Sequence, residues 1–337
     1  MKHYNLGFLG FGNVGKALAR LLVAKSAELK ELYGIEWRVT GVAKRRLGWL
    51  ADPAGLEIPA VVDSSPASDQ TSSCSSIGEW LLKAQPDVVF ETISLNHTTG
   101  QPAIDYLTAV LMSGAHAITA NKGAVVYGYD QLSELAKGAG KQFLFESTVL
   151  DSAPVFSLFR ETLPAAKLRG FSGILSSTTN VILETMEAGR SFEEGVKTAQ
   201  ELGITETDPS HDVEGWDATV KVCALARVLM KIPLNPTGVR REGIRQLTTH
   251  MLQAARAEGK PLKLVARAKI ADDGSVNATV RPEQLAISDP LANVRGTSLA
   301  AHFELDMMPG LTITSHRPNL QSTAYGLMAD FINAVKH

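Results

Sequence analysis

A glycine-rich turn near the N-terminus constrains the fold of this chain more than any other feature. An apolar segment, residues 6–9, runs into the spacing Gly-x-Gly-x-x-Gly, and an amphipathic segment then continues to about Leu32. The glycines of this spacing are Gly10, Gly12 and Gly15. In a strand–turn–helix unit they permit a tight turn, close approach of a pyrophosphate, and packing of the helix on the strand. The pattern predicts a dinucleotide-binding unit, with Asn13 and Val14 at the helix N-terminus. The alternative is a structural glycine turn that binds no nucleotide.

The end of the next apolar segment bears on the choice of cofactor. Residues 37–42 are expected to form a strand, and the sequence Ala-Lys-Arg-Arg follows at positions 43–46. Folds that bind NAD usually carry Asp or Glu here, which accepts a hydrogen bond from the ribose 2′-hydroxyl. Lys44 and Arg45 would instead attract a 2′-phosphate, so the sequence favours NADP(H) over NAD(H). The alternative is a solvated basic loop.

Composition narrows the class of protein. The chain has 337 residues, which is enough for two domains with substantial cores. Its formal net charge of −2 gives no reason to expect a nucleic-acid or acidic-membrane partner. Two cysteines offer no disulfide framework and fit a reducing cytoplasm. We expect a cytoplasmic enzyme with no signal peptide and no membrane span.

The first half of the chain alternates expected strands and helices. Such alternation predicts a Rossmann-type, doubly wound parallel sheet, here over residues 1–148, with residues 47–76 as an irregular insertion. Ligands of these sheets bind at the carboxyl ends of the strands. Those ends carry candidate side chains, which are Glu91, Thr92, Ser94, Asn121, Lys122 and Glu146.

The second half predicts a different architecture. Helices come first, and apolar strands then follow, including one expected over residues 293–304. We expect a second, α+β domain over residues 149–317 that binds substrate and forms a dimer. The C-terminal helix, within residues 318–337, is expected to pack back on the first domain.

An acidic run follows the middle of the chain, between Gly203 and Lys221. Its carboxylates are Glu206, Asp208, Asp212, Glu214 and Asp217. A helix is expected to begin near residue 216, so Asp217 and Lys221 share one helix face. Such a loop suits recognition of a small ligand with an ammonium group. The alternative is an acidic surface loop with an exposed ion pair.

Several motifs in a fixed order resemble those of homoserine dehydrogenases, and they cover nearly the whole chain. They include Thr-Ala-Asn-Lys at 119–122, Phe-Glu-Ser-Thr-Val at 145–149, Gly-Ile-Leu-Ser-Ser-Thr-Thr-Asn at 173–180, the acidic run, and Thr-Ala at 323–324. The chain resembles the short form of the family, which lacks a C-terminal regulatory ACT domain. The resemblance implies reversible hydride transfer between L-aspartate-4-semialdehyde and L-homoserine, a step of threonine and methionine biosynthesis.

The resemblance also implies roles for individual residues. Lys221 resembles the acid/base lysine, oriented by Asp217, and Lys122 resembles a second active-site lysine. Reduction of an aldehyde needs such a cationic acid, because charge develops on the carbonyl oxygen. Glu206 and Asp212 resemble the acids that receive the ammonium and hydroxyl groups of the substrate.

Further roles concern the substrate carboxylate and the bound groups. Ser177 and Thr178, at an expected helix start, would bind the α-carboxylate, although plain helix capping is the alternative. The family often has Asn-Gly where this chain has Ser176-Ser177. The resemblance adds Thr92, Asn121, Lys122 and Thr323 to the cofactor site. Some relatives bind a monovalent cation such as Na⁺, and the candidate ligands here are Glu146, Val149, Asp151 and Ala153.

Other functions remain open at this point. The chain could act on another small amino-acid alcohol or aldehyde. A semialdehyde dehydrogenase that oxidises its aldehyde would need a nucleophilic cysteine, and the candidates are Cys74 and Cys223. A non-catalytic NADP-binding sensor is a third interpretation, which the presence of both Lys122 and Lys221 disfavours.

Overall fold

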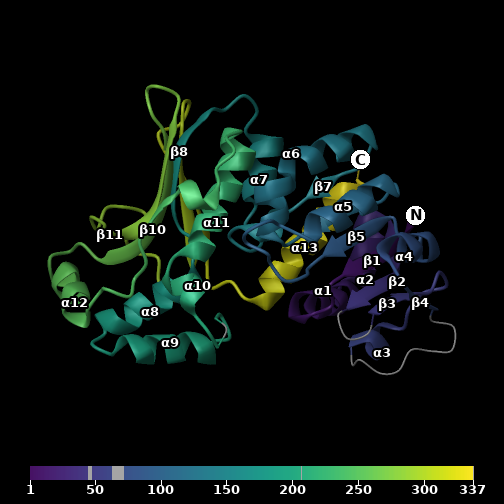
Figure 1. Ribbon diagram of the computed structural model, residues 1–337, viewed down its shortest axis with the longest axis horizontal. Coiled ribbons are helices and arrows are strands. Elements are labelled where there is room, and N and C mark those ends of the chain that lie inside the picture. The colour runs from purple at the N-terminus through teal and green to yellow at the C-terminus, as the bar shows by residue number, and fades with distance from the viewer. Residues whose placement is uncertain (45–47, 63–71, 206, 337) are drawn as a thin grey trace. The chain divides into compact units, whose positions relative to one another are not determined.

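The computed structural model divides the chain into two compact units. It describes residues 1–44, 48–62, 72–205 and 207–336. The first unit comprises residues 1–152 together with the C-terminal segment from Asn319, and the second comprises residues 153–318 (Figure 1). The sequence placed the first boundary after residue 148.

The first unit is built on a sheet with the strand order β4-β3-β2-β1-β5-β6-β7. Strands β2, β1, β5, β6 and β7 pair in parallel, whereas β3 and β4 add antiparallel pairs at one edge. This confirms the Rossmann-type fold class. The strands are β1 (Lys2–Leu9), β2 (Ile35–Lys44), β3 (Gly48–Ala51), β4 (Ser72–Cys74), β5 (Val88–Glu91), β6 (His116–Thr119) and β7 (Phe143–Leu144). The helices are α1 (Asn13–Ala24), α2 (Ser26–Tyr33), α3 (Ile58–Val62), α4 (Ile77–Ala84), α5 (Ala103–Met112), α6 (Lys122–Gly138), the short η1 (Glu146–Thr148) and α13 (Leu320–Val335).

Two local expectations for this unit were wrong. The segment 47–76 is not simply irregular, because β3 pairs with β2 and β4 pairs with β3. The expected helix that ended near Leu32 is two helices, since α1 ends at Ala24 and α2 begins at Ser26. Short edge strands depend on pairing with a neighbour rather than on a long apolar pattern, so periodicity did not reveal them.

The C-terminal helix packs on the first unit, where it contacts α1 (Figure 1). Phe331 meets Phe90 edge-on, with ring centroids 6.1 Å apart. The backbone N–H of Glu146 donates to the buried carboxylate of Asp330 over 2.8 Å. Gly326 sits so close to Ser147 that a Cβ there would lie 2.3 Å from its Oγ. Apolar packing and hydrogen bonds thus join the C-terminal helix to the rest of the first unit.

The second unit holds a sheet with the order β13-β12-β8-β10-β11-β9, in which only the β11–β9 pair is parallel among those described. Its strands are β8 (Leu168–Ile174), β9 (Arg240–Arg241), β10 (Leu262–Ile270), β11 (Val276–Gln284), β12 (Leu299–Leu305) and β13 (Leu311–Ser315). Its helices are α7 (Val155–Ser157), η2 (Leu158–Thr162), α8 (Ser177–Glu187), α9 (Phe192–Glu201), α10 (Ser210–Val213), α11 (Trp216–Leu225), η3 (Ala226–Met230), η4 (Pro236–Gly238) and α12 (Thr249–Ala257). This mixture confirms the expected second domain of helices and strands.

One strand of this unit starts later than expected. Residues 293–298 form turns and irregular structure, and β12 begins only at Leu299. The carbonyl oxygens of Val294 and Gly296 accept hydrogen bonds from the side-chain amide of Asn180, and the buried Lys263 also donates to Val294. Because side chains distant in sequence bind these carbonyls, the segment does not extend the strand.

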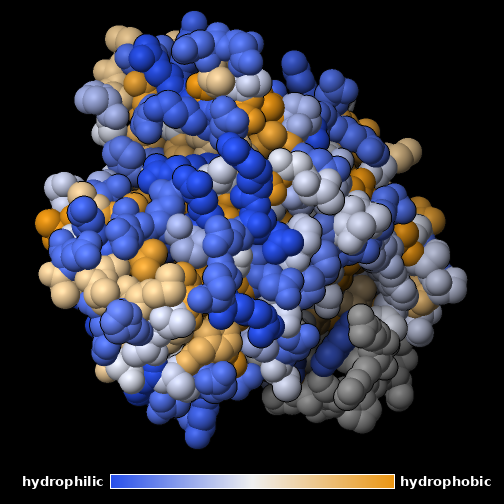
Figure 2. Space-filling view, turned by 60° about the vertical axis from the view of Figure 1, so that its left-hand side comes forward, coloured by the Kyte–Doolittle hydropathy of each residue, from blue (hydrophilic) through white to orange (hydrophobic). Residues whose placement is uncertain are grey.

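The visible surface is mostly hydrophilic. Figure 2 shows apolar residues in patches among hydrophilic side chains. Exposed apolar side chains include those of Leu82, Met112 and Met307. Single side chains of this kind are ordinary on a protein surface. In the parts of the chain that the structure describes, no helix has the length and apolar character needed to cross a membrane.

A buried carboxylate ties together the ends of β5 and β6. Glu91 is fully buried, and its oxygens accept from the Thr119 hydroxyl at 2.5 Å, the Ile93 N–H at 2.8 Å and the Asn121 amide at 3.4 Å. The Thr119 hydroxyl in turn accepts from the Asn121 N–H at 2.8 Å. This network fixes the two loops that leave the carboxyl edge of the sheet.

The burial of Glu91 predicts a pH-dependent contribution to stability. Burial raises the pKa of Glu91 to about 7, so the folded chain holds this proton more tightly than the unfolded chain. The resulting stabilisation is fully present below the ordinary value of 4.5 and is lost as the pH rises through about 7. Between about pH 5 and pH 8 the wild type should lose stability relative to Glu91→Gln, by up to about 3 kcal/mol. Urea denaturation of both chains measures this, and a pH-independent difference would contradict it.

Candidate active site

The glycine turn of the first unit has the shape that a dinucleotide requires. Gly10 has φ +90°, and a Cβ there would lie 2.7 Å from the Thr92 carbonyl carbon. A Cβ on Gly15 would lie 2.9 Å from the Gly10 oxygen, so this glycine permits close packing of α1. At Gly12 a Cβ would meet no atom within 4 Å, so the backbone is open on that side. An open backbone at a helix N-terminus can bind a pyrophosphate, and the residues present therefore fit a nicotinamide dinucleotide.

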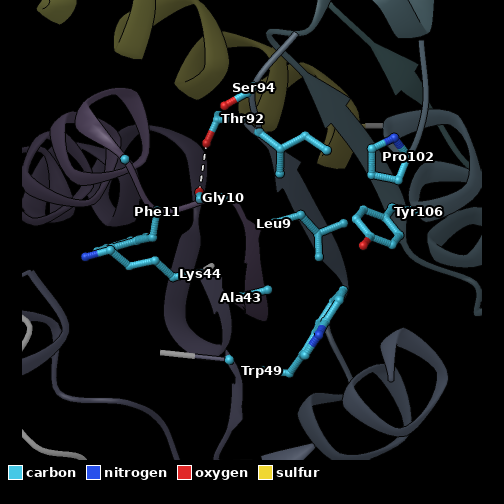
Figure 3. Close-up of a pocket in the computed structure, with 13 residues that line it drawn as sticks. Leu9, Gly10, Phe11, Ala43, Lys44, Trp49, Thr92, Ser94, Pro102 and Tyr106 are labelled. Atoms are coloured by element: carbon cyan, nitrogen blue, oxygen red, sulfur yellow. Dashed lines mark hydrogen bonds between the residues drawn. The ribbon is translucent and has the colours of Figure 1, made fainter. Parts of the chain in front are cut away.

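A cleft lies at the carboxyl ends of β1, β2 and β5 (Figure 3). Four of the residues expected at the cofactor line it, namely Gly10, Gly12, Lys44 and Thr92. The other lining residues are Leu9, Phe11, Ala43, Gly48, Trp49, Ile93, Ser94, Pro102 and Tyr106. The Thr92 hydroxyl donates to the Gly10 carbonyl at 2.8 Å, which ties the β5 loop to the glycine turn. The predicted Arg45 lies outside the described residues.

The remaining cofactor candidates lie on helix starts of the first unit. Asn13 and Val14 open α1. Asn121 caps α6, where its side-chain oxygen accepts from the Gly123 N–H at 3.0 Å, and Lys122 is the first residue of that helix. Thr323 lies in the first turn of α13, and its hydroxyl donates to Asp151 at 3.1 Å. None of these residues is among those that line the described cleft.

The second unit gathers a lysine and two carboxylates at the end of β8. The ammonium of Lys221 lies 2.8 Å from Asp217 and donates to the Leu175 carbonyl at 2.6 Å. Only 12% of the Lys221 side chain and 21% of the Asp217 side chain are exposed, so water screens the ion pair less than it would a surface pair. The interpretation of these two residues as an exposed surface pair is therefore wrong.

Asp212 lies beside this ion pair. The hydroxyl of Thr205 donates to its carboxylate over 3.0 Å. Burial raises the pKa of Asp212, and the negative charge of Asp217 raises it further, whereas the hydrogen bond from Thr205 and the positive charge of Lys221 act in the opposite direction. A partly buried carboxylate beside a second carboxylate and a lysine is typical of a site that binds a charged ligand.

The N-terminus of α8 adjoins the same strand end. Ser176 caps the helix, with its side chain accepting from the Thr179 N–H at 3.4 Å. The hydroxyl of Ser177 donates to the Thr297 carbonyl at 2.8 Å, and that of Thr178 donates to the Ile204 carbonyl at 3.0 Å. The first N–H groups of a helix have no partner within it, so the backbone rather than these hydroxyl protons offers donors to an anion.

Two further expectations concern other parts of the chain. Glu206 lies outside the described residues. Of the candidate cation ligands, Glu146, Val149 and Asp151 belong to the first unit, whereas Ala153 begins the second. Within the described ranges, no cluster of three or more His, Cys, Asp or Glu side chains is arranged for a metal ion. The cation site stays a prediction.

The structure disfavours a cysteine nucleophile. Both Cys74 and Cys223 are buried. Burial raises the pKa of the Cys223 thiol to about 12 and also raises that of Cys74. The reactive form of cysteine is the thiolate, which such burial suppresses.

Sequence reasoning missed several contributors to these sites. The Leu175 carbonyl positions Lys221, but a backbone carbonyl leaves no trace in residue type. The Thr205 hydroxyl belongs to the acidic run and could have been found there. Trp49 and Tyr106 line the cleft from segments that showed no ligand motif.

Comparisons of sequence agree on one family. The homoserine dehydrogenase model matches residues 154–332, and the model of the homoserine dehydrogenase NAD-binding domain matches residues 10–146. The NAD(+)-dependent homoserine dehydrogenase of Pseudomonas canavaninivorans is 31% identical, over 99% of this chain and 96% of the relative. The homoserine dehydrogenase of Methanocaldococcus jannaschii is 32% identical, over 96% of each chain.

Solved structures give the same result. A homoserine dehydrogenase from Thiobacillus denitrificans is similar with a TM-score of 0.84 and 27% identity, over 100% of this chain and 74% of that one. A hyperthermophilic archaeal homoserine dehydrogenase in complex with NADPH is similar with a TM-score of 0.81 and 25% identity, over 99% and 98%. The resemblance of the motifs is confirmed: the chain belongs to the homoserine dehydrogenase family of oxidoreductases.

Proposed function

We propose that this protein is an NADP(H)-dependent homoserine dehydrogenase that interconverts L-aspartate-4-semialdehyde and L-homoserine. The observation that carries the proposal is the largely buried cluster of Lys221, Asp217 and Asp212 at the end of β8. It offers a proton donor and an ammonium-binding acid close together, which are the two groups that an amino-acid aldehyde requires.

Lys221 is the acid/base group of this proposal. The reduced nicotinamide, when bound, supplies a hydride to the aldehyde carbon. As negative charge develops on the aldehyde oxygen, the Lys221 ammonium donates a proton to it, and in the reverse direction the neutral amine accepts the hydroxyl proton. Asp217 and the Leu175 carbonyl orient the ammonium through contacts of 2.8 Å and 2.6 Å. Lys122 is the second lysine, which binds substrate or relays the proton.

The other polar groups of the substrate bind to the remaining candidate residues. Asp212 and Glu206 receive the ammonium and hydroxyl groups. The backbone N–H groups of Ser177 and Thr178 bind the α-carboxylate at the positive end of α8. The buried side chain of Thr178 donates to the carbonyl of Ile204, which precedes α10 and its Asp212 in the chain.

The preference for NADP(H) rests on the basic end of β2. Lys44 lines the cleft, and Arg45 follows it in sequence. No acidic residue is among the described residues that line the cleft. Names of relatives support either cofactor, because one is NAD(+)-dependent and another was solved with NADPH. The local charge of this chain is the reason for our choice.

The wider assignment follows from the same proposal. The reaction belongs to threonine and methionine biosynthesis, and we place it in the cytoplasm. We propose a homodimer formed through the second unit, whose sheet ends in β13 at one edge and in the two-residue β9 at the other. The monovalent-cation site near Glu146 remains part of the proposal.

Replacing Lys221 should abolish most turnover without weakening the binding of the cofactor. General acid/base help is worth roughly 10²–10⁴-fold, so Lys221→Ala should lower kcat by about that factor. The matched control is Lys197→Ala, whose side chain is 76% exposed on α9. Steady-state oxidation of homoserine gives kcat, and fluorescence titration gives the Kd for NADP⁺. Retention of more than about a tenth of the wild-type kcat would show that another group moves the proton.

Removing an acid from the substrate site should raise the KM for homoserine. Asp212→Asn and Glu206→Gln each remove a charged partner of the substrate, and such hydrogen bonds are worth about 1.5–3 kcal/mol, or roughly 10- to 100-fold. Asp208→Asn is the control, because this exposed carboxylate of the same run accepts a hydrogen bond from the Ser210 N–H. Initial rates over a range of homoserine concentrations measure the effect. An unchanged KM in both variants would remove these acids from the substrate site.

The cofactor preference should depend on the basic pair. Wild-type protein should bind NADP(H) more tightly than NAD(H), because a phosphate paired with a cation gains a charge-assisted hydrogen bond. The preference should shrink in Lys44→Ala/Arg45→Ala, by about tenfold or more. Calorimetric titration of both cofactors into both proteins measures the Kd values. Equal values in the wild type would refute the preference, and a preference that survives the mutations would assign the phosphate to other residues.

A further inference from the structure

Two aromatic side chains line the dinucleotide cleft without a role in the site described above. Trp49 comes from β3 and Tyr106 from α5, and both side chains are partly exposed. Their rings meet edge-on with centroids 5.4 Å apart. Figure 3 shows them together on one side of the cleft, whereas Lys44 extends on the other side with Phe11. They form an aromatic wall, which we define as Trp49 and Tyr106.

The aromatic wall is held in place from behind. Trp80 is fully buried, and its ring lies 5.9 Å from that of Trp49. The indole N–H of Trp80 donates to the Leu50 carbonyl at 2.8 Å, which fixes the strand that carries Trp49. A rigid wall loses little conformational entropy when a ligand packs on it.

The position of the wall identifies the half of the dinucleotide that it faces. In this fold the pyrophosphate lies at the glycine turn, and the nicotinamide lies toward the strand ends beyond it. The wall stands instead next to β2 and its antiparallel neighbour β3, near Lys44. In dinucleotide-binding folds of this type, the adenosine ribose binds on that side. A flat ring system attached to that ribose is the group that aromatic side chains bind well.

We propose that Trp49 and Tyr106 form the adenine subsite of this enzyme. The inference rests on the proposed use of NADP(H) and deepens it. Lys44 binds the phosphate on the ribose, and the aromatic wall packs against the base, so charge and stacking act on different parts of one nucleotide. The aromatic wall does not contact the nicotinamide.

Dissecting the cofactor into halves tests the subsite. Adenosine 2′,5′-bisphosphate carries the adenine half, and nicotinamide mononucleotide carries the other half. Stacking of a base on an aromatic ring contributes measurably to affinity. Trp49→Leu and Tyr106→Leu should therefore each raise the Kd for adenosine 2′,5′-bisphosphate and for NADP⁺ by about tenfold or more. Nicotinamide mononucleotide should keep its Kd within about twofold. Isothermal titration calorimetry measures all three without the oxidation reaction.

Matched variants keep the test sharp. Trp49→Phe retains an aromatic face and should restore most of the affinity for adenosine 2′,5′-bisphosphate. Trp37→Leu changes another partly buried tryptophan, on β2 but outside the residues that line the cleft, and should leave all affinities unchanged. Thermal melting of each variant identifies any that do not fold. If the leucine variants do not fold, Trp49→Phe is compared with Trp37→Leu by tryptophan fluorescence. The fluorescence change on binding of adenosine 2′,5′-bisphosphate should shrink in Trp49→Phe and persist in Trp37→Leu.

Two results would overturn the subsite. One is an unchanged Kd for adenosine 2′,5′-bisphosphate in folded Trp49→Leu and Tyr106→Leu. The other is an equal loss for nicotinamide mononucleotide, which would assign the wall to the cleft as a whole. A protein that binds NADP⁺ through Trp49 but does not oxidise homoserine would keep the subsite and lose only the proposed substrate.

Discussion

The close approach of Gly10 to the backbone of Thr92 is the constraint on which the cofactor cleft depends. A side chain at Gly10 would place its Cβ 2.7 Å from the Thr92 carbonyl carbon, so only glycine lets the ends of β1 and β5 lie so near. The Thr92 hydroxyl then bonds to the Gly10 carbonyl and fixes that distance. Because α1 begins directly after this turn, the same contact aims the helix N-terminus at the cleft. Glu91, next to Thr92, extends the bracing to the β6 loop through its buried carboxylate.

In the second unit, the end of β8 has a comparable role. The Leu175 carbonyl accepts from Lys221, and the next residue, Ser176, caps α8. One strand end therefore orients the Lys221 ammonium and starts the helix whose N–H groups can receive an anion. The electrostatic cost of this arrangement is visible at Asp212, whose pKa is raised by burial and by Asp217. Carboxylates with a shifted pKa often mark functional sites, because binding and catalysis need charged groups in partly buried positions.

Local signals in the sequence were reliable where one segment determines its own structure. The Gly10–Gly15 turn, the start of α11 at the acidic run and the parallel sheet were all expected from short patterns. The expectations failed where the structure of a segment depends on its pairing with another segment. Strand β3 depends on pairing with β2 and β4 on pairing with β3, and residues 293–298 are held out of a strand by Asn180 and Lys263. The apolar periodicity of a segment carries no information about a hydrogen-bond partner more than a hundred positions away. Asn180 is such a partner for the carbonyls of Val294 and Gly296.

The sequence by itself determined the family, the dinucleotide turn and the residue types of the proposed site, because these reside in short motifs with a fixed order. Only the tertiary structure decided how those residues are used. It showed that the Lys221–Asp217 pair is largely buried, that the hydroxyls of Ser177 and Thr178 donate to distant carbonyls, and that Trp49 shares a cleft with Tyr106. Burial and contact depend on which segments the fold brings together, and a side chain has no such property until its neighbours are in place.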